Sequence, residues 1–211
     1  MRSARFPVRK APATPPVPVR DKPTAVKHPS SRRLYAYWSE RRANRPAPER
    51  SDIDPAAIRA LLGDSFVLSG ENERRFRVAG TRIGALFGRE LRGEPFASIW
   101  DGRSAALIRD AVMGVAEGAG IIAGAQAQGR AGPTIHLELL LLPLIHAQTI
   151  GGRMLGLLTA QERPYWLGMW PAAPLRLATI RYLVEPAAPA LIARVRARRP
   201  RHLTVIEGGR L

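Results

Sequence analysis

The chain has 211 residues, a formal net charge of +16 and no cysteine. A chain of this length can bury one domain core and still carry tails, and 45% hydrophobic with 24% charged residues is typical of a globular protein. The absence of cysteine excludes disulfides, thiolate nucleophiles, zinc fingers and iron–sulfur clusters.

The positive charge is concentrated at the two ends of the chain. Residues 1–33 hold nine Lys or Arg and one acid, and residues 186–211 hold six Arg and one Glu, whereas 34–185 holds 18 basic and 15 acidic residues. Basic ends attract polyanions such as nucleic acid, anionic lipid or acidic proteins, but they also serve simply as solubilising tails. The sequence leaves both interpretations open.

No stretch of the sequence is apolar for long enough to span a membrane. Uninterrupted apolar runs such as Leu139 to Ile145 are much shorter than the roughly 20 residues that a spanning helix needs. The basic N-terminus has no apolar region of the kind that a secretory signal needs. We therefore expect a cytoplasmic protein.

The first third of the chain is predicted to contain a tail and two helices. Residues 1–30 are rich in proline and poor in large apolar groups, which indicates disorder. Ser30 or Ser31 is expected to cap a helix that runs to about Arg42. Asp52 or Asp54 is then expected to cap a short helix that ends at Gly63, with Pro55 in its first turn.

Two strands and three helical segments are expected next. A short apolar run at 65–68 and the alternating stretch 74–79 predict strands, the second with Phe76 and Val78 on one face. Short apolar clusters follow at 83–87 and 96–100. Asp101 is expected to cap a helix that runs to about Glu117.

Three more strand patterns lie at about 121–128, 134–146 and 153–162, and Gly151-Gly152 is expected to form the turn before the last. In the strand expected at 134–146, the side chains on one face are apolar throughout, whereas those on the other face change from polar to apolar along the strand. This change indicates that another helix or strand covers part of the second face. Residues 175–184 form a weaker strand pattern, blurred at Ala178 and Ile180. From Pro186 onward, we expect a basic C-terminal helix or tail.

This order, with grouped strands and helices between them, predicts an α+β fold: a five-stranded antiparallel sheet with helices on one face, preceded by an N-terminal helix. Residues 31–185 are expected to form that domain.

The order of elements is also that of PAS domains, and local sequence supports the likeness. The stretches 34–38 (LYAYW), 45–48 (RPAP), 52–55 (DIDP), 75–83 (RFRVAGTRI) and 87–93 (FGRELRG) resemble a family of alphaproteobacterial PAS-like regulatory proteins. The resemblance covers about 32–185 and leaves out the basic, Pro-rich head and the basic tail. It implies a sensory or interaction module, similar to signalling adaptors of cell-cycle or motility control, with no catalytic residues to carry over.

The histidines do not form a metal site in the sequence. His28 and His202 lie in the expected tails. His136 and His146 are ten residues apart on one strand, which is roughly 33 Å. His136 and Glu138 face the same way, but one such pair is too few for zinc. No cofactor is required by the sequence, and we expect neither haem nor flavin.

Catalytic motifs are missing as well. The sequence has no Walker A motif, no G-x-S-x-G motif, and glycines at 118, 120 and 124 whose spacing and position differ from the dinucleotide-binding fingerprint. We therefore do not expect an enzyme.

Apolar residues from the strands and helices should meet in a core that is either simply packed or hollow enough for a small ligand. Trp100 is the expected wall and Arg82 the expected polar anchor of such a pocket. The full candidate set is Phe76, Val78, Arg82, Ile83, Phe87, Phe96, Trp100, Ile108, Leu137 and Leu139.

The aromatic residues Tyr35, Tyr37 and Trp38 are candidates for partner binding. They could cover the sheet of their own chain or pack on a second copy, and a homodimer is expected. The leading functional hypothesis is a non-catalytic PAS module that binds a signalling protein, with or without a small ligand. The alternative is a nucleic-acid-associated protein that uses its basic termini.

Overall fold

A computed structural model of the chain describes residues 26–128, 134–162 and 171–183. Six strands form one antiparallel sheet in the order β2-β1-β5-β4-β3-β6. They are β1 (Ser65–Ser69), β2 (Arg75–Ala79), β3 (Gly120–Gln128), β4 (Thr134–His146), β5 (Thr149–Ala160) and β6 (Arg176–Leu183).

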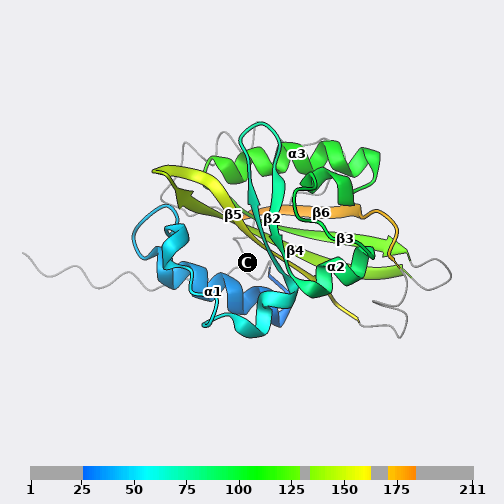
Figure 1. Cartoon of the computed structure of the whole chain (residues 1–211), viewed down its shortest axis with the longest axis horizontal. Helices are drawn as coiled ribbons and strands as arrows, with labels where there is room; N and C mark the ends of the chain where they lie inside the picture. Colours follow the sequence, from blue (N-terminus) through cyan, green and yellow to red (C-terminus); the bar gives the residue numbers. More distant parts are fainter. Residues whose placement is uncertain (1–25, 129–133, 163–170, 184–211) are drawn as a thin grey trace, which may run out of the picture.

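The helices form two layers, one on each side of this sheet (Figure 1). The longer helices are α1 (Pro29–Arg42) and α3 (Gly102–Ala116), and α2 (Thr81–Phe87) is shorter. Three 3₁₀ segments complete the set: η1 (Arg50–Asp52), η2 (Arg59–Asp64) and η3 (Phe96–Ile99). In place of the short helix expected after Asp52, the chain forms the 3₁₀ segment η2, whereas η1 ends at Asp52. Within the described residues, no helix combines the length and the apolar character needed to cross a bilayer.

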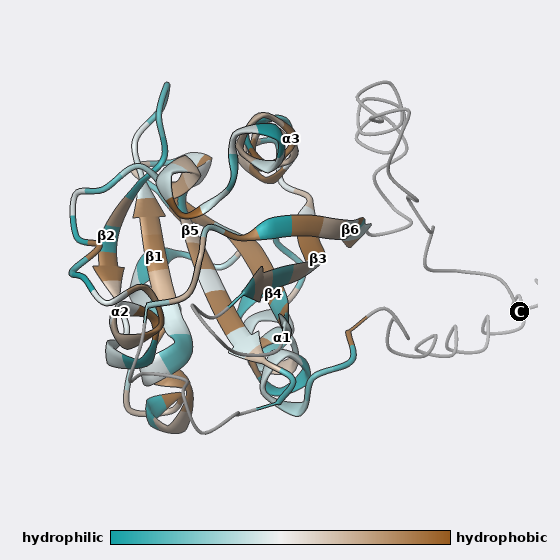
Figure 2. Ribbon diagram, turned by 90° about the vertical axis from the view of Figure 1, so that its right-hand side faces the viewer, coloured by the Kyte–Doolittle hydropathy of each residue, from teal (hydrophilic) through white to brown (hydrophobic). Residues whose placement is uncertain are grey.

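Strand β4 explains why two helical layers are needed. Its residues Ile135, Leu137, Leu139 and Leu141 belong to a core shared with α2, η3 and α3, whereas Leu140, Leu142 and Leu144 belong to a second core shared with α1. Figure 2 shows α3 and α1 on opposite sides of this largely apolar sheet. The predicted α+β class is confirmed, but helices cover both faces rather than one.

The sheet has six strands rather than the five that the sequence predicted. Strand β6 pairs with β3, and its register shifts between Gly124 and Ala125, which pair with Thr179 and Leu177. Ala178 is therefore an extra residue in a bulge, which lets Leu177 and Ile180 both enter the core. Because of this bulge, apolar and polar residues do not alternate regularly in the sequence of 175–184.

The N-terminal boundary of the folded part lies earlier than predicted. Val26 is 4% exposed and packs in the α1-side core. The buried carboxylate of Glu138 accepts hydrogen bonds from the backbone N–H groups of Lys27 (3.0 Å) and His28 (2.9 Å). Residues 26–30, expected in the disordered tail, thus belong to the fold. The rest of that tail and the C-terminal extension 186–211 lie outside the described residues.

Capping matches the prediction at one helix and differs at another. Asp101 caps α3 as expected, with its Oδ1 accepting the Ser104 N–H at 2.7 Å. The Ser104 hydroxyl and N–H both lower the pKa of Asp101. Helix α1 is capped by the Nδ1 of His28, which accepts the Ser30 N–H, rather than by a serine.

The turn between β4 and β5 lies at Ala147 and Gln148, both with positive φ, rather than at the predicted Gly151-Gly152. Gly151 has φ of 68° and passes the end of α3 so closely that a Cβ there would lie 2.5 Å from the Ala116 Cα. Within the glycine pair, Gly151 therefore allows β5 to pass close to the end of α3, and the pair does not form the hairpin turn.

Gly156 makes room for an aromatic ring in the α3-side core. It pairs with Phe66 across β5 and β1, and a Cβ on Gly156 would lie 2.0 Å from Cζ of the Phe66 ring. The ring of Phe66 cannot move away freely, because it contacts the rings of Phe76 and Phe96.

We expect Gly156→Ala to lower the free energy of unfolding by about 1–3 kcal/mol, because the added methyl group overpacks the core beside Phe66. Urea unfolding followed by circular dichroism measures the effect. Gly102→Ala is the matched control, since a Cβ there meets nothing within 4 Å, and it should be neutral or slightly stabilising. Equal free energies of unfolding for wild type and Gly156→Ala would show that the Phe66 ring does not pack against Gly156 as described.

Candidate functional site

Four aromatic side chains fill the centre of the core between the sheet and α3. The ring centroids of Phe66 and Phe76 are 5.4 Å apart, those of Phe66 and Phe96 5.5 Å, and those of Phe96 and Trp100 6.0 Å. These spacings are those of contacting aromatic pairs. The rings come from β1, β2, η3 and the residue after η3. Their contacts therefore connect the first two strands to the segment that leads into α3.

One polar atom in this cluster has no partner within the described part of the chain. The Nε1 of Trp100 is buried and donates to no acceptor there. A buried indole N–H usually finds an acceptor, because leaving it unpaired costs about 1–3 kcal/mol. Within the described residues, this N–H is thus a polar group of the cluster whose hydrogen-bonding capacity is unused.

Eight of the ten predicted pocket residues do lie together in this core. They are Phe76, Ile83, Phe87, Phe96, Trp100, Ile108, Leu137 and Leu139. The other two, Val78 and Arg82, do not line it.

Val78 is the first exception, and a bulge is the reason. Phe76 pairs with Leu68 and Val78 pairs with Val67, so two steps along β2 match one step along β1. The extra residue, Arg77, reverses the alternation, and Val78 lies opposite Val67 rather than on the side of Phe76. Val78 is 57% exposed, whereas Phe76 is 1% exposed.

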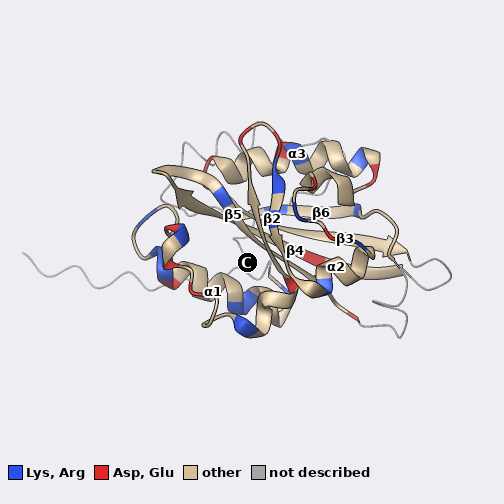
Figure 3. Cartoon of the chain, in the orientation of Figure 1, with Lys and Arg blue, Asp and Glu red and all other residues tan. Residues whose placement is uncertain are grey.

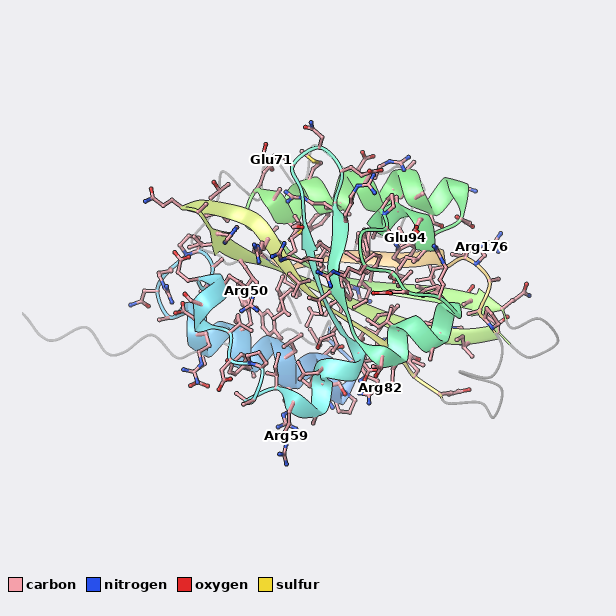
Figure 4. All side chains as sticks on the ribbon, viewed as in Figure 1. Arg50, Arg59, Glu71, Arg82, Glu94 and Arg176 are labelled. Atoms are coloured by element: carbon pink, nitrogen blue, oxygen red, sulfur yellow. The ribbon has the colours of Figure 1, made fainter. Side chains whose placement is uncertain are left out.

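Arg82 is the second exception. Its Nε and one Nη lie 2.7 and 2.8 Å from the two carboxylate oxygens of Asp64, and its exposed side chain lies on the side of α2 that faces away from α3 (Figure 4). The hydrogen bond to Asp64 raises the pKa of Arg82. Arg82 therefore joins α2 to η2 at the surface and does not anchor a ligand in the core.

The three aromatic residues proposed for partner binding are used inside the chain. Trp38 is buried, and its Nε1 donates to the carbonyl of Pro143 at 2.8 Å. Tyr35 stacks on Trp38, and the Tyr37 hydroxyl accepts the Asp54 N–H at 2.8 Å. Trp38 thus covers the sheet of its own chain, whereas Tyr35 and Tyr37 stay partly exposed, and partner binding through them stays a prediction.

The histidines contribute no metal site within the described residues, where no group of three or more His, Asp or Glu side chains could hold an ion. His136 and His146 are exposed near the two ends of β4. His28, expected in a disordered tail, is instead the cap of α1.

The structure also reveals a surface that the sequence analysis missed, which we call the open face. It is the end of the sheet on the side of α1 that the helices leave uncovered, and it comprises Val67, Val78, Arg50, Arg77 and Arg153. The register places Leu155, Val67 and Val78 side by side on neighbouring strands, and Arg153 lies two residues before Leu155. Only the tertiary structure brings Arg50 and Arg153 to this place.

The comparisons with known proteins agree with this architecture. The family model described as PAS domain matches residues 26–159. The chain belongs to the PAS domain family. Members of this family are sensory or regulatory modules. The match begins at Val26, where Glu138 anchors the chain, and ends in β5, so that β6 lies beyond it. The search of curated proteins found no match.

If the indole N–H of Trp100 has no acceptor, Trp100→Phe should lower the free energy of unfolding by only about 1–2 kcal/mol, because only apolar contact is lost. Trp100→Ala should cost about 3–5 kcal/mol. Urea unfolding of both variants measures the difference. An equal loss in the two variants would show that the N–H makes an essential hydrogen bond.

Proposed function

We propose that this PAS domain is a non-catalytic regulatory module that acts by binding a signalling protein. The observation that supports this most is the contrast between the two sides of β2. Phe76 belongs to a core filled by contacting rings, whereas the bulge at Arg77 turns Val78 out to solvent on the open face. An exposed apolar side chain on a strand, next to charged ones, suits contact with another protein.

The same contacts suggest how a bound partner could change the domain. The open face is bordered by the segment that leads from α1 into η1, and this segment pairs with the end of β4 through the Ile145 N–H and the Pro48 carbonyl. A partner that favours one position of this segment would shift the packing of α1 on the sheet. The signal would then pass on as a change in helix position.

Two other functions have an observation in their favour. A small ligand in the core would use the unpaired Trp100 N–H. A nucleic-acid-associated role would use the basic ends of the sequence. A homodimer through Tyr35, Tyr37 and Trp38 has less support than it had from the sequence, because Trp38 is buried in its own chain. The cytoplasmic location stays a prediction.

Affinity capture with the full-length protein from its native extract tests the proposal. After nuclease treatment, at about 0.15 M salt, we expect a specific protein to remain bound. Recovery of nucleic acid alone, lost on nuclease treatment, would favour the alternative and contradict the proposal. The intact mass of the purified protein under native conditions shows separately whether a small ligand is carried.

A further inference from the structure

The open face combines exposed apolar and basic side chains on the α1 side of the sheet. Helix α1 packs over β4 and β5, and η2 packs over the start of β1. Val67 is partly buried at the border of that core, while its partner Val78 is largely exposed.

Three guanidinium groups surround these valines. Arg153 lies on β5 opposite Ser69, two residues from Leu155, and so it points to the same side of the sheet as Val67. Arg77 directly precedes Val78 in β2. Arg50 begins η1 and lies between α1 and the strands β5 and β2 (Figure 4). Figure 3 shows the basic positions on β2 and β5.

Within the described residues, no carboxylate forms an ion pair with any of these three arginines. Arg50 donates only to the carbonyl of Ile53, and the Nε of Arg153 is buried without an acceptor. The nearby carboxylate of Asp52 is already used, because it accepts the Glu49 N–H at 2.9 Å and pairs with Arg45. Burial lowers the pKa of Arg153, and the charges of Arg77 and Arg50 lower it further, so the three groups are close enough to repel one another.

This repulsion and the missing acceptor destabilise the cluster until a negative group reaches it. We propose that the open face binds an acidic segment of the partner protein, with carboxylates on Arg50, Arg77 and Arg153 and an apolar side chain on Val78. The proposal rests on the proposed function and names the chemistry of the partner.

The apolar part of the surface favours a protein segment over nucleic acid. A phosphate backbone would pair with the arginines but would leave Val78 and Val67 against charged, hydrated groups. Successive side chains of an extended segment point to opposite sides, so a segment that carries an acidic and an apolar residue in turn at every second position presents both kinds of side chain to this one face of the sheet. The arginines then supply attraction and orientation, and the valines add buried apolar area.

Binding of a labelled peptide that repeats Glu-Ser-Val-Ser to the full-length protein, measured by fluorescence anisotropy at about 0.15 M salt, tests this. We expect the double variant Arg77→Gln/Arg153→Gln to bind about five- to tenfold more weakly than wild type. Arg103→Gln/Arg109→Gln, which removes two exposed arginines of α3, is the control for the loss of two positive charges and should bind within about twofold of wild type. The same peptide with Gln in place of Glu should not bind.

Other results would overturn the proposal. Equal affinities of wild type and the double variant would place peptide binding elsewhere, such as on the basic ends. A single-stranded DNA oligomer that binds, and loses affinity in the same variant while the peptide does not bind, would assign the surface to nucleic acid. Because the arginines repel one another, the melting temperature of the double variant should equal or exceed that of wild type, and a sharp fall would show that they are structural.

Failure here is distinguishable from failure of the proposed function. If the double variant still captures the protein partner from the native extract, the regulatory module stands and only the surface is wrong. If no variant and no wild-type protein captures a partner, the proposed function itself fails.

Discussion

The structure depends on one constraint: the central strands of the sheet are apolar on both faces. In β4, Leu139 faces one helical layer and Leu140 faces the other, and both are buried. Neither face can be left to water without a large loss of apolar burial. Helix α1 is therefore a structural layer of this PAS domain rather than an appended arm, and Glu138 and Trp38 hold it in place with hydrogen bonds to and from the backbone.

This cover ends before the β1–β2 end of the sheet, and that is where the open face begins. The bulge at Arg77 determines its character, because it turns Val78 away from the aromatic core and toward solvent. The same strand thus contributes Phe76 to the packing of the domain and Val78 to its surface. Fold and proposed function are linked through one extra residue.

The sequence predicted the elements that have a periodic signal or a cap. The Asp101 cap, the strand at 134–146 and most of the core set were visible because each depends on local spacing. Long-range pairing was not visible. The bulges at Arg77 and Ala178 shift register relative to a partner strand, the ion pair of Arg82 with Asp64 spans 18 residues, and Glu138 binds a segment 110 residues away. A sequence pattern read one segment at a time contains none of these contacts.

Hydrogen exchange of the full-length protein, read by mass spectrometry, tests most directly whether α1 is a layer of the domain. The amides of α1 should exchange about as slowly as those of β4, and Glu138→Gln should speed exchange in 26–42 much more than in α3, since it places an amide NH₂ group where two N–H donors converge. If the amides of α1 instead exchange within seconds while those of β4 stay protected, α1 is not a stable part of the fold. The conclusion that helices cover both faces of the sheet would then be wrong.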